Sequence, residues 1–294
     1  MFGHRQRSVQ TYLHIAALLI CASPSSFGQT VGTLTLAEGK VALMRGTTTY
    51  SATQGVRLQS GDMLAIDPEG QAQIEFQDGA ILNLSRGSSA MLLGNQGPGG
   101  EAGIAVQSGW AKFTQAKLAK GRAYRYLTPL ARLATAGATG VLRAGENFSE
   151  IFVESGTARF VELAKEGSPA GGRNVRGGEF TVRRSGQPAT VAPRPSADFV
   201  KNMPVHFRDN LPVLLDRFKN GEVEPKREHE VTYAEVETWL KASTPIRRNF
   251  VSRFQNRAKD TEFRNKLIEN LREHPEWDRV LFPEKYKPKD RKDP

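Results

Sequence analysis

The stretch "GDMLAIDPEGQAQIEFQDGAILNLSRGSSAML", residues 61–92, reads as three short strands separated by turns. In "AQIEFQ" the apolar residues Ala72, Ile74 and Phe76 alternate with polar neighbours, and "AILNLS" repeats the alternation. A period of two is typical of a strand with one face buried and one face towards solvent. This stretch therefore predicts antiparallel strands joined by tight turns.

Three acidic residues in this stretch, Asp62, Glu69 and Asp78, lie close to glycines. "DPEG" and "QDGA" are β-turn sequences, in which Pro sets a backbone angle and Asp bonds back to the main chain. A calcium loop needs several oxygen ligands within one short segment, whereas these acids lie seven or more residues apart. We therefore predict turn formers, with no metal site and no cofactor.

The same pattern of short alternating runs and glycines extends over residues 29–184 and then stops. A Pro-rich stretch, "SGQPATVAPRPS", covers residues 185–196. Charged residues make up 31 of the 167 positions in 29–195 but 39 of the 99 in 196–294. The change in composition predicts a domain boundary there.

Beyond the boundary the apolar period becomes helical. Leucines and a phenylalanine at i, i+3, i+4 and i+7 predict a helix over residues 211–218, and similar spacing predicts helices near Tyr233 and Phe263. Helix starts are predicted at the capping box "TYAE", at Thr244 before Pro245, and at Asp260 or Thr261. We expect three or four helices, forming a small bundle or packing against the strands.

These patterns give a β + α fold class, with a Gly-rich all-β domain of short strands before a small C-terminal helical domain. We expect the β domain to be β-helix-like, with a sandwich as the alternative. The predicted division is a signal peptide over 1–28, the β domain over 29–184, a Pro-rich linker over 185–198, a helical domain over 199–282 and a flexible tail over 283–294.

The N-terminal residues resemble a secretory signal peptide. Arg5 and Arg7 precede an apolar run over 12–22 that is too short to span a bilayer, and small and polar residues follow. A lipoprotein signal using Cys21 is one alternative, but Ile20 stands where that signal needs a small residue. An uncleaved membrane anchor is a second alternative. Because Cys21 is the single cysteine, a cleaved chain has no disulfide. We expect an exported protein of a Gram-negative periplasm.

The net charge of +10 is spread along the chain. Residues 29–195 hold 18 basic and 13 acidic residues, and 196–294 hold 21 and 18. No dense basic run is joined to stacking aromatic residues, which argues against nucleic acid as a partner. No later segment is apolar enough for a membrane helix, and an anionic envelope glycan is a candidate partner.

Three segments of the strand region share one pattern: "LAEGKVAL", "VQSGWAKF" and "VESGTARF". Each has an aliphatic residue, a glycine three places later, and then two apolar residues on alternate positions. Gly39, Gly55 and Gly61 recur 117 residues later at 156, 172 and 178. We interpret this as a reused strand-turn unit in which glycine supplies the backbone angles of a turn or bulge.

The order of these motifs over residues 31–184, from "GKVALMRG" and "GVRLQSGDML" to "VESGTARFVEL" and "VRGGEFTVRR", resembles the FecR-like domain. That domain is the periplasmic part of transmembrane regulators of iron-uptake sigma factors. The resemblance implies an all-β domain of β-helical character that binds protein partners in the envelope and is not known for catalysis.

Two features depart from those regulators. They carry a cytoplasmic sigma-binding segment and a membrane helix before the β domain, whereas here the β domain directly follows a signal peptide. A highly charged helical region then follows the strands. We therefore do not predict direct control of a sigma factor, and iron-uptake regulation rests on the resemblance alone.

A search for catalytic residues finds little. Outside the signal the histidines are His206, His229 and His274, all in the helical half, and no G-x-S-x-G, H-E-x-x-H or phosphate loop is present. The sequence "EHPEWD" around His274 is typical of a charged helix end. We predict that the protein is not an enzyme.

Trp110 is the candidate contact residue. In the register of the repeat it matches Lys40 and Thr157, which face outward. A large outward aromatic residue either packs beneath an added helical segment, which we favour, or marks a contact surface, where Arg86 or Arg143 would lie beside it. The aromatic residues of the helical half are predicted to be core.

The sequence thus predicts an exported, non-enzymatic binding or signal-transducing module of the cell envelope. It would recognise a protein partner or an envelope glycan through an edge strand or an outward β face. A structural component of an envelope assembly and a hydrolase with a site between the domains, using His206 or His274, are the alternatives.

Overall fold

The computed structural model describes residues 30–95, 102–115, 123–164, 167–209 and 212–287. The predicted signal peptide lies outside these residues, as does most of the predicted tail. Mostly antiparallel strands are followed by a C-terminal helical region, which confirms the coarse β + α prediction. The β-helical character is a finer statement and stays a prediction.

The strands form one continuous sheet that folds into two layers joined by the long strand β9, Ala102–Thr114. Layer A contains, in spatial order, β4 (Arg57–Gln59), β1 (Thr30–Glu38), β6 (Gln71–Glu75), β7 (Ile81–Leu84), the second half of β9, β12 (Thr139–Gly145), β13 (Phe148–Ser155), β16 (Phe180–Arg184) and β17 (Thr190–Ala192).

Layer B contains, in spatial order, β18 (Lys226–Glu230), β3 (Thr48–Ser51), β2 (Val41–Arg45), β5 (Met63–Ile66), β8 (Ser89–Asn95), the first half of β9, β10 (Tyr124–Leu127), β11 (Ala131–Thr135), β14 (Thr157–Leu163) and β15 (Pro169–Arg176). Only the β9–β10 pair is parallel among these pairings. The main apolar core lies between the layers and takes side chains from both, including Leu34, Leu82, Leu142, Leu43, Tyr126 and Phe160.

The repeated glycines mark corners where the chain passes between the layers. Gly39 separates β1 in layer A from β2 in layer B, and Gly156 separates β13 from β14 in the same way. Gly109 is the point at which β9 changes layer. All three have positive φ, and a Cβ on Gly156 would lie 2.8 Å from the carbonyl oxygen of Gly137. The repeat therefore reflects a corner that only glycine fits well.

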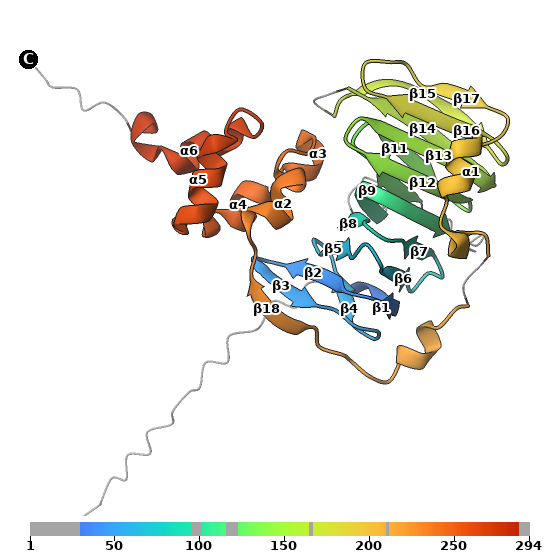
Figure 1. Ribbon diagram of the computed structural model, residues 1–294, viewed down its shortest axis with the longest axis horizontal. Coiled ribbons are helices and arrows are strands. Elements are labelled where there is room, and N and C mark those ends of the chain that lie inside the picture. Colours follow the sequence, from blue (N-terminus) through green and yellow to red (C-terminus); the bar gives the residue numbers. More distant parts are fainter. Residues whose placement is uncertain (1–29, 96–101, 116–122, 165–166, 210–211, 288–294) are drawn as a thin grey trace, which may run out of the picture.

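The helical region covers the outward face of layer B, on the opposite side of the sheets from α1 (Figure 1). Its helices and 3₁₀ turns are α2 (Tyr233–Leu240), α3 (Thr244–Arg247), α4 (Phe250–Phe254), η3 (Arg257–Lys259), α5 (Thr261–Glu269), η4 (Pro275–Trp277), α6 (Asp278–Leu281) and η5 (Pro283–Tyr286). Methionines of layer B pack with Trp239, Phe254 and other aromatic residues in one apolar cluster. The predicted core role of these aromatic residues is confirmed by their burial.

Arg253 fixes the position of the helices on layer B. It is largely buried and donates hydrogen bonds to the main-chain oxygens of Gly46, Gly61 and Met44 at 2.8, 2.6 and 3.0 Å. Burial lowers the pKa of Arg253 to about 10. Three carbonyl oxygens thus replace the water that the guanidinium loses.

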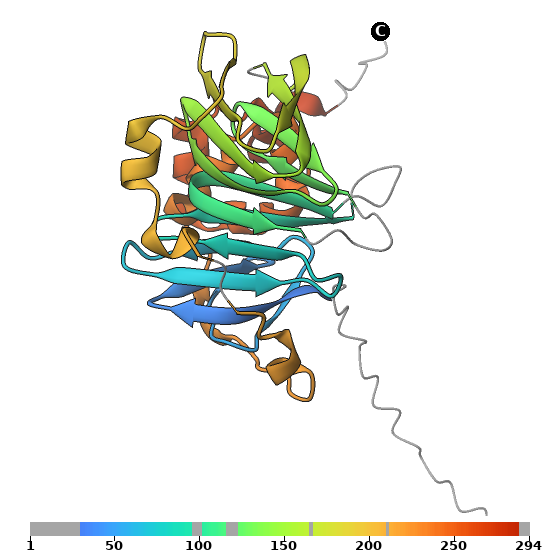
Figure 2. The same ribbon diagram turned by 90° about the vertical axis from the view of Figure 1, so that its right-hand side faces the viewer.

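Residues 197–231, which we call the strap, connect the two faces. They contain α1 (Ala197–Asn202), η1 (Val205–Phe207), η2 (Leu215–Phe218) and β18. The strap begins on the outward face of layer A, passes the edge formed by the N-terminal strands, and reaches layer B, where β18 pairs with β3 (Figures 1 and 2). The predicted linker over 185–198 contains β17, and the predicted helical domain over 199–282 contains β18.

The prediction of a helix over 211–218 is wrong for its described part, which forms only the 3₁₀ turn η2, while Leu211 lies outside the described residues. The carboxylate of Glu75 accepts hydrogen bonds from the amides of Leu214 and Leu215 at 2.8 and 3.1 Å. These contacts tie the start of η2 to the sheet, and tertiary contacts override the local period.

Three local predictions are confirmed. Thr232 and Glu235 form the reciprocal capping box of α2, and Asp260 caps α5 through the amide of Phe263. In the turn over 67–70, the amide of Gly70 donates to the carbonyl oxygen of Asp67 at 2.9 Å.

Candidate functional site

Trp110 lies on the outward face of layer A beneath α1. Its side chain is 9% exposed, and its ring centroid is 4.9 Å from that of Phe199. Phe180 and Phe207 complete this second apolar cluster. Of the two roles weighed from the sequence, Trp110 takes the packing role, and a contact with a partner would have to be made by the groups around it.

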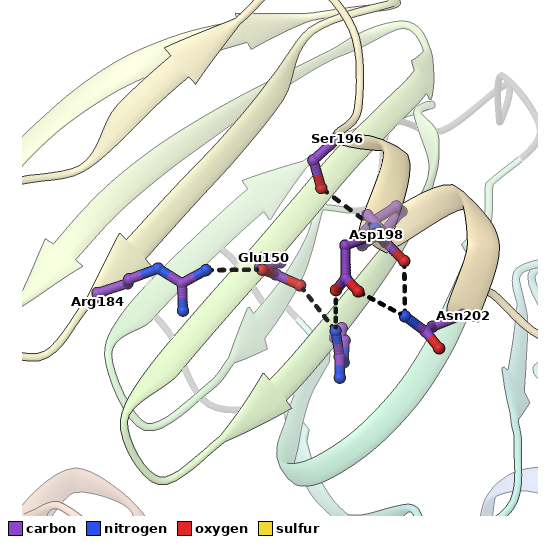
Figure 3. Close-up of polar contacts among 7 residues, drawn as sticks. Glu150, Arg184, Ser196, Asp198 and Asn202 are labelled. Carbon is purple, nitrogen blue, oxygen red and sulfur yellow. Dashed lines mark hydrogen bonds and ion pairs between the residues drawn. The ribbon is translucent and has the colours of Figure 1, made fainter.

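Arg143 lies beside Trp110 and is partly exposed. Its guanidinium carbon is 5.2 Å from the ring centroids of both Trp110 and Phe148. Its Nη1 is 3.4 Å from a carboxylate oxygen of Asp198 on α1 and 3.5 Å from one of Glu150 on β13 (Figure 3). The cation is thus held by two rings and two carboxylates, which fixes its direction.

The polar network continues on both sides of Arg143. Glu150 is 5% exposed and also pairs with Arg184 at 3.4 Å. On α1, the amide of Phe199 donates to the Oγ of Ser196, and the side-chain amide of Asn202 donates to Asp198 (Figure 3). The Arg143–Asp198 pair, whose carboxylate is 72% exposed, adds at most about 1 kcal/mol to stability. The network therefore orients charges on the surface more than it holds the fold.

An open, mainly apolar hollow of about 830 Å³ adjoins this network, between β17 and α1. Its lining includes prolines, alanines and the exposed Val200, together with the cations Arg194 and Lys201. Val191 on β17 and Val200 on α1 are 38% and 42% exposed. Exposed aliphatic side chains beside fixed charges are typical of a protein contact surface. We call the hollow and the Arg143 network together the α1 surface.

Arg86 does not join the Arg143 network. It lies in the turn between β7 and β8 and lines a second hollow of about 340 Å³, with Glu38, Glu69 and His206. The turn is tied to the strand of Trp110, because the Oγ of Ser88 donates to the carbonyl oxygen of Trp110 at 2.8 Å. The structure therefore places Trp110 and Arg143 together and Arg86 in a neighbouring hollow of the same outward face.

The acidic residues of the opening stretch have separate roles. Glu69 lies in the turn over 67–70, where its amide donates to a side-chain oxygen of Asp67 at 3.2 Å. Asp78 accepts from the amide of Ala80 at 3.1 Å and from the hydroxyl of Tyr124 at 2.8 Å. Both act in turns, as predicted.

Asp62 does more than form a turn. It is 1% exposed, and its carboxylate is 2.7 Å from Arg45 and accepts the amide of Gln59 at 2.8 Å. Its partner Arg45 lies on β2, and no local pattern indicates that pairing. Within the described ranges, no group of three or more His, Cys, Asp or Glu residues could hold a metal ion.

The three histidines outside the predicted signal peptide lie in different surroundings. His274 is fully buried, its Nε2 is 3.2 Å from the hydroxyl of Tyr233, and burial lowers its pKa. His206 lies at the surface hollow with Arg86, and burial lowers its pKa as well. The side chain of His229 is about half exposed, and its Nε2 is 3.0 Å from the carboxylate of Glu235 at the start of α2. Of these, only His206 lines a hollow on the face of the candidate site.

Sequence reasoning missed Glu150, Asp198 and Val200. The only local signal for Asp198 and Val200 was a helix start, because Ser196 after the prolines is an N-cap residue. For Glu150, nothing local distinguishes a carboxylate that two arginines share from any other outward strand residue.

The comparisons with known proteins add little. No family model matches the chain. A search of curated proteins found no match. Two crystal structures of a candidate anti-sigma factor from Parabacteroides distasonis ATCC 8503 are similar at 13% identity with a TM-score of 0.39. The similarity covers 47% of this chain and 62% of that protein, so the chain spans less than two thirds of it. A likeness this weak carries no weight for the function of this chain.

In the part of the chain that the structure describes, no helix has the length and apolar character needed to cross a membrane.

Proposed function

We propose that the chain is an exported, non-enzymatic binding or signal-transducing module of the cell envelope, and that it recognises a protein partner through the outward face of layer A. An envelope glycan is the second kind of partner that the sequence allows. The periplasm is the proposed location, since the first 28 residues read as a signal peptide.

The α1 surface is the observation that carries this proposal. It combines an open apolar hollow, lined by the exposed Val200, with a cation held in a fixed direction by Glu150 and Asp198. Interfaces of this type have an apolar centre with charged groups at the rim. Trp110 supports α1 from below, so the contact surface rests on a packed cluster.

The FecR-like motif order supports the same class of function. That resemblance implies an envelope domain that binds proteins, and the two-layered strand region with glycine corners covers the same residues. A sigma-factor pathway and iron uptake are not part of the proposal, because the highly charged helical region that follows the strands departs from those regulators.

A pair of matched variants tests the proposal. Val200→Asp places a carboxylate in the hollow, and Ile268→Asp makes the same change at an equally exposed position, 39%, on α5. Both should fold, because each side chain is already partly in water. The mature chain should retain the same envelope protein from periplasmic extract when it carries Ile268→Asp and lose it with Val200→Asp.

Two results would contradict the proposal. Retention that is equal in both variants would place the contact elsewhere, and no retained partner combined with histidine-dependent turnover would favour the hydrolase. A partner bound by the intact surface in fixed stoichiometry within a larger assembly would favour the structural alternative.

The hollow around His206 is the one observation that favours the hydrolase. His206 lies there with Glu38, Glu69 and Arg86, and its lowered pKa leaves the imidazole neutral and able to accept a proton near neutral pH. If His206 is a general base, the chain should show a turnover that His206→Ala abolishes. If the chain is a binding module, His206→Ala should still retain its partner.

A further inference from the structure

The four outer edges of the two layers are treated differently. In layer B one edge is β18 of the strap, a five-residue strand of charged side chains whose pairing with β3 shifts register between Arg227 and His229. In layer A the strap meets the end beside β4, where Val56 and Val223 form a bridge. The other edge of layer A is β17, which has three residues and is followed by Pro193. Short, covered or proline-flanked edges are common protections against unwanted strand pairing.

Strand β15 is the longest of the four edge strands, and it begins with Pro169 beside a register shift against β14. It has eight residues, pairs with β14 on one side, and has no strand on its other side among the residues that the structure describes. Seven of its eight residues are exposed, and only Val175 is buried. β15 lies at the opposite end of the sheets from β18 (Figure 1). Its free side presents main-chain donors and acceptors to which an extended chain can pair.

Basic residues outnumber acidic ones around this edge, where Glu162 on β14 lies 4.0 Å from Arg173 and 3.2 Å from Arg183 and Glu179 accepts the amide of Arg176. The strand itself carries Arg173 and Arg176 and no acid. Cross-strand register places Asn174 opposite Arg159, Arg159 opposite Ala134, and Ala134 opposite Arg125. These residues alternate with buried ones, so they lie on the outward face of layer B, as does Arg132, which pairs with Val161. Four arginines therefore share that face at this end: Arg125, Arg132, Arg159 and Arg176.

We infer that β15 is a docking edge for an extended acidic segment of a protein partner, which adds a strand to layer B. This inference goes beyond the proposed function, because it places a second contact at an edge of layer B and names the chemistry of the segment bound there. The main chain of the segment would pair with β15, and its acidic side chains on alternate positions would meet Arg176 and Arg159 on one face and Arg173 on the other. Backbone pairing provides affinity, and the alternate side chains provide selectivity.

A second copy of the chain fits this edge less well. Two β15 strands paired with each other would bring Arg173 and Arg176 of one copy close to those of the other, and like charges on facing strands destabilise a pair. An anionic glycan would use the arginines but not the unpaired backbone. The acidic peptide is the occupant that uses both features.

The test is a binding titration with a fluorescent peptide of alternating Glu and Thr, about as long as β15. The whole chain should bind it, and the same peptide with Lys in place of Glu should not bind. Arg173→Glu combined with Arg176→Glu should weaken binding by at least about tenfold, because attraction becomes repulsion. Arg272→Glu, an exposed arginine on the helical side, is the matched control and should leave binding unchanged.

Two N-methylated forms of the peptide separate strand pairing from simple charge attraction. Methyl groups on one set of alternate amides block the hydrogen bonds to β15, and methyl groups on the other set point to solvent. One form should lose binding and the other should keep it, while hydrogen exchange at residues 169–176 should slow only with the form that binds.

Equal binding of both methylated forms, an unchanged affinity of the double arginine variant, or equal competition by polygalacturonate would overturn the inference. If the double variant fails to fold, Arg176→Glu alone, at an exposed position, gives the same comparison. Failure of the proposed function has a separate readout. In that case Val200→Asp would leave retention of the envelope partner unchanged, whether or not the peptide binds β15.

Discussion

The two outward faces of the sheets are covered in different ways. On layer B the helices rest on an apolar surface of Met44, Met63 and Met91, which packs against Trp239 and its neighbours. On layer A, Phe199 and Phe207 of the strap pack against the Trp110 cluster, and buried polar side chains also bind the main chain of the strap. Glu75 accepts the amides of Leu214 and Leu215, and Lys112 donates to the carbonyl oxygen of Phe207 at 2.6 Å.

The difference concerns what each contact demands of its partner. Apolar packing depends mainly on buried area and volume, so many side chains can satisfy it. A buried carboxylate such as Glu75, which is 2% exposed, is stable only when donors are correctly placed around it. The helices are therefore held mainly by apolar burial, whereas the strap also needs hydrogen bonds at fixed points of its main chain.

Removing the largest side chain from the helix interface should have the largest effect. Trp239→Ala deletes a fully buried side chain at the contact between α2 and layer B and should lower the free energy of unfolding by about 3–5 kcal/mol. Urea unfolding followed by circular dichroism measures the loss. Thr238→Ala, at an exposed position on the same helix, should change the free energy of unfolding by less than about 0.5 kcal/mol. Equal effects of the two variants would contradict the apolar account.

Removing the polar anchor of the strap should have a smaller and more local effect. Glu75→Ala leaves the amides of Leu214 and Leu215, the hydroxyl of Thr35 and the amide of Gln73 without their acceptor, at a cost of about 2–3 kcal/mol. Hydrogen exchange should accelerate at residues 214 and 215 while α2 keeps its protection. Glu75→Gln, which retains one acceptor oxygen, should fall between the two. Unchanged exchange at 214 and 215 would show that other contacts hold the strap.

The same contrast explains which features could be predicted from sequence. The capping box of α2, the Asp260 cap and the turn over 67–70 join groups two or three residues apart, so the local sequence contains both partners. The glycine corners were visible because the same geometry recurs along the chain. The path of the strap was not, since Glu75 binds amides 139 and 140 residues away and a main-chain amide has no sequence signature.

For the candidate site, the register of the repeat placed Trp110 on the outward side of the core, and Arg143 does lie beside it. What covers Trp110 could not be derived, because α1 arrives from a segment beyond the prolines and is too short to show a helical period. The hollow between β17 and α1 depends on the position that α1 takes over Trp110. Its lining residues come from one continuous stretch, 192–201, whose composition alone suggested only a linker.

The smallest effect we predict separates the two faces by pH. His274 is buried within the helical region, and its pKa is lowered, first by burial and then by Arg247 and Lys241, with Glu273 acting in the opposite direction. Its pKa in the folded chain lies below the ordinary value of 6.5, so below that pH the unfolded chain binds more protons than the folded one. Stability should fall as the pH decreases from about 6.5, and it should rise to a plateau above that value.

His274→Gln keeps a polar side chain near the hydroxyl of Tyr233 and should flatten this dependence in urea unfolding at a series of pH values. Loss of protection on acidification should begin in the helices on layer B, because His274 contributes to them and not to the strap. A pH dependence that is unchanged in His274→Gln, or that begins at residues 214 and 215, would assign it to the polar contacts of layer A.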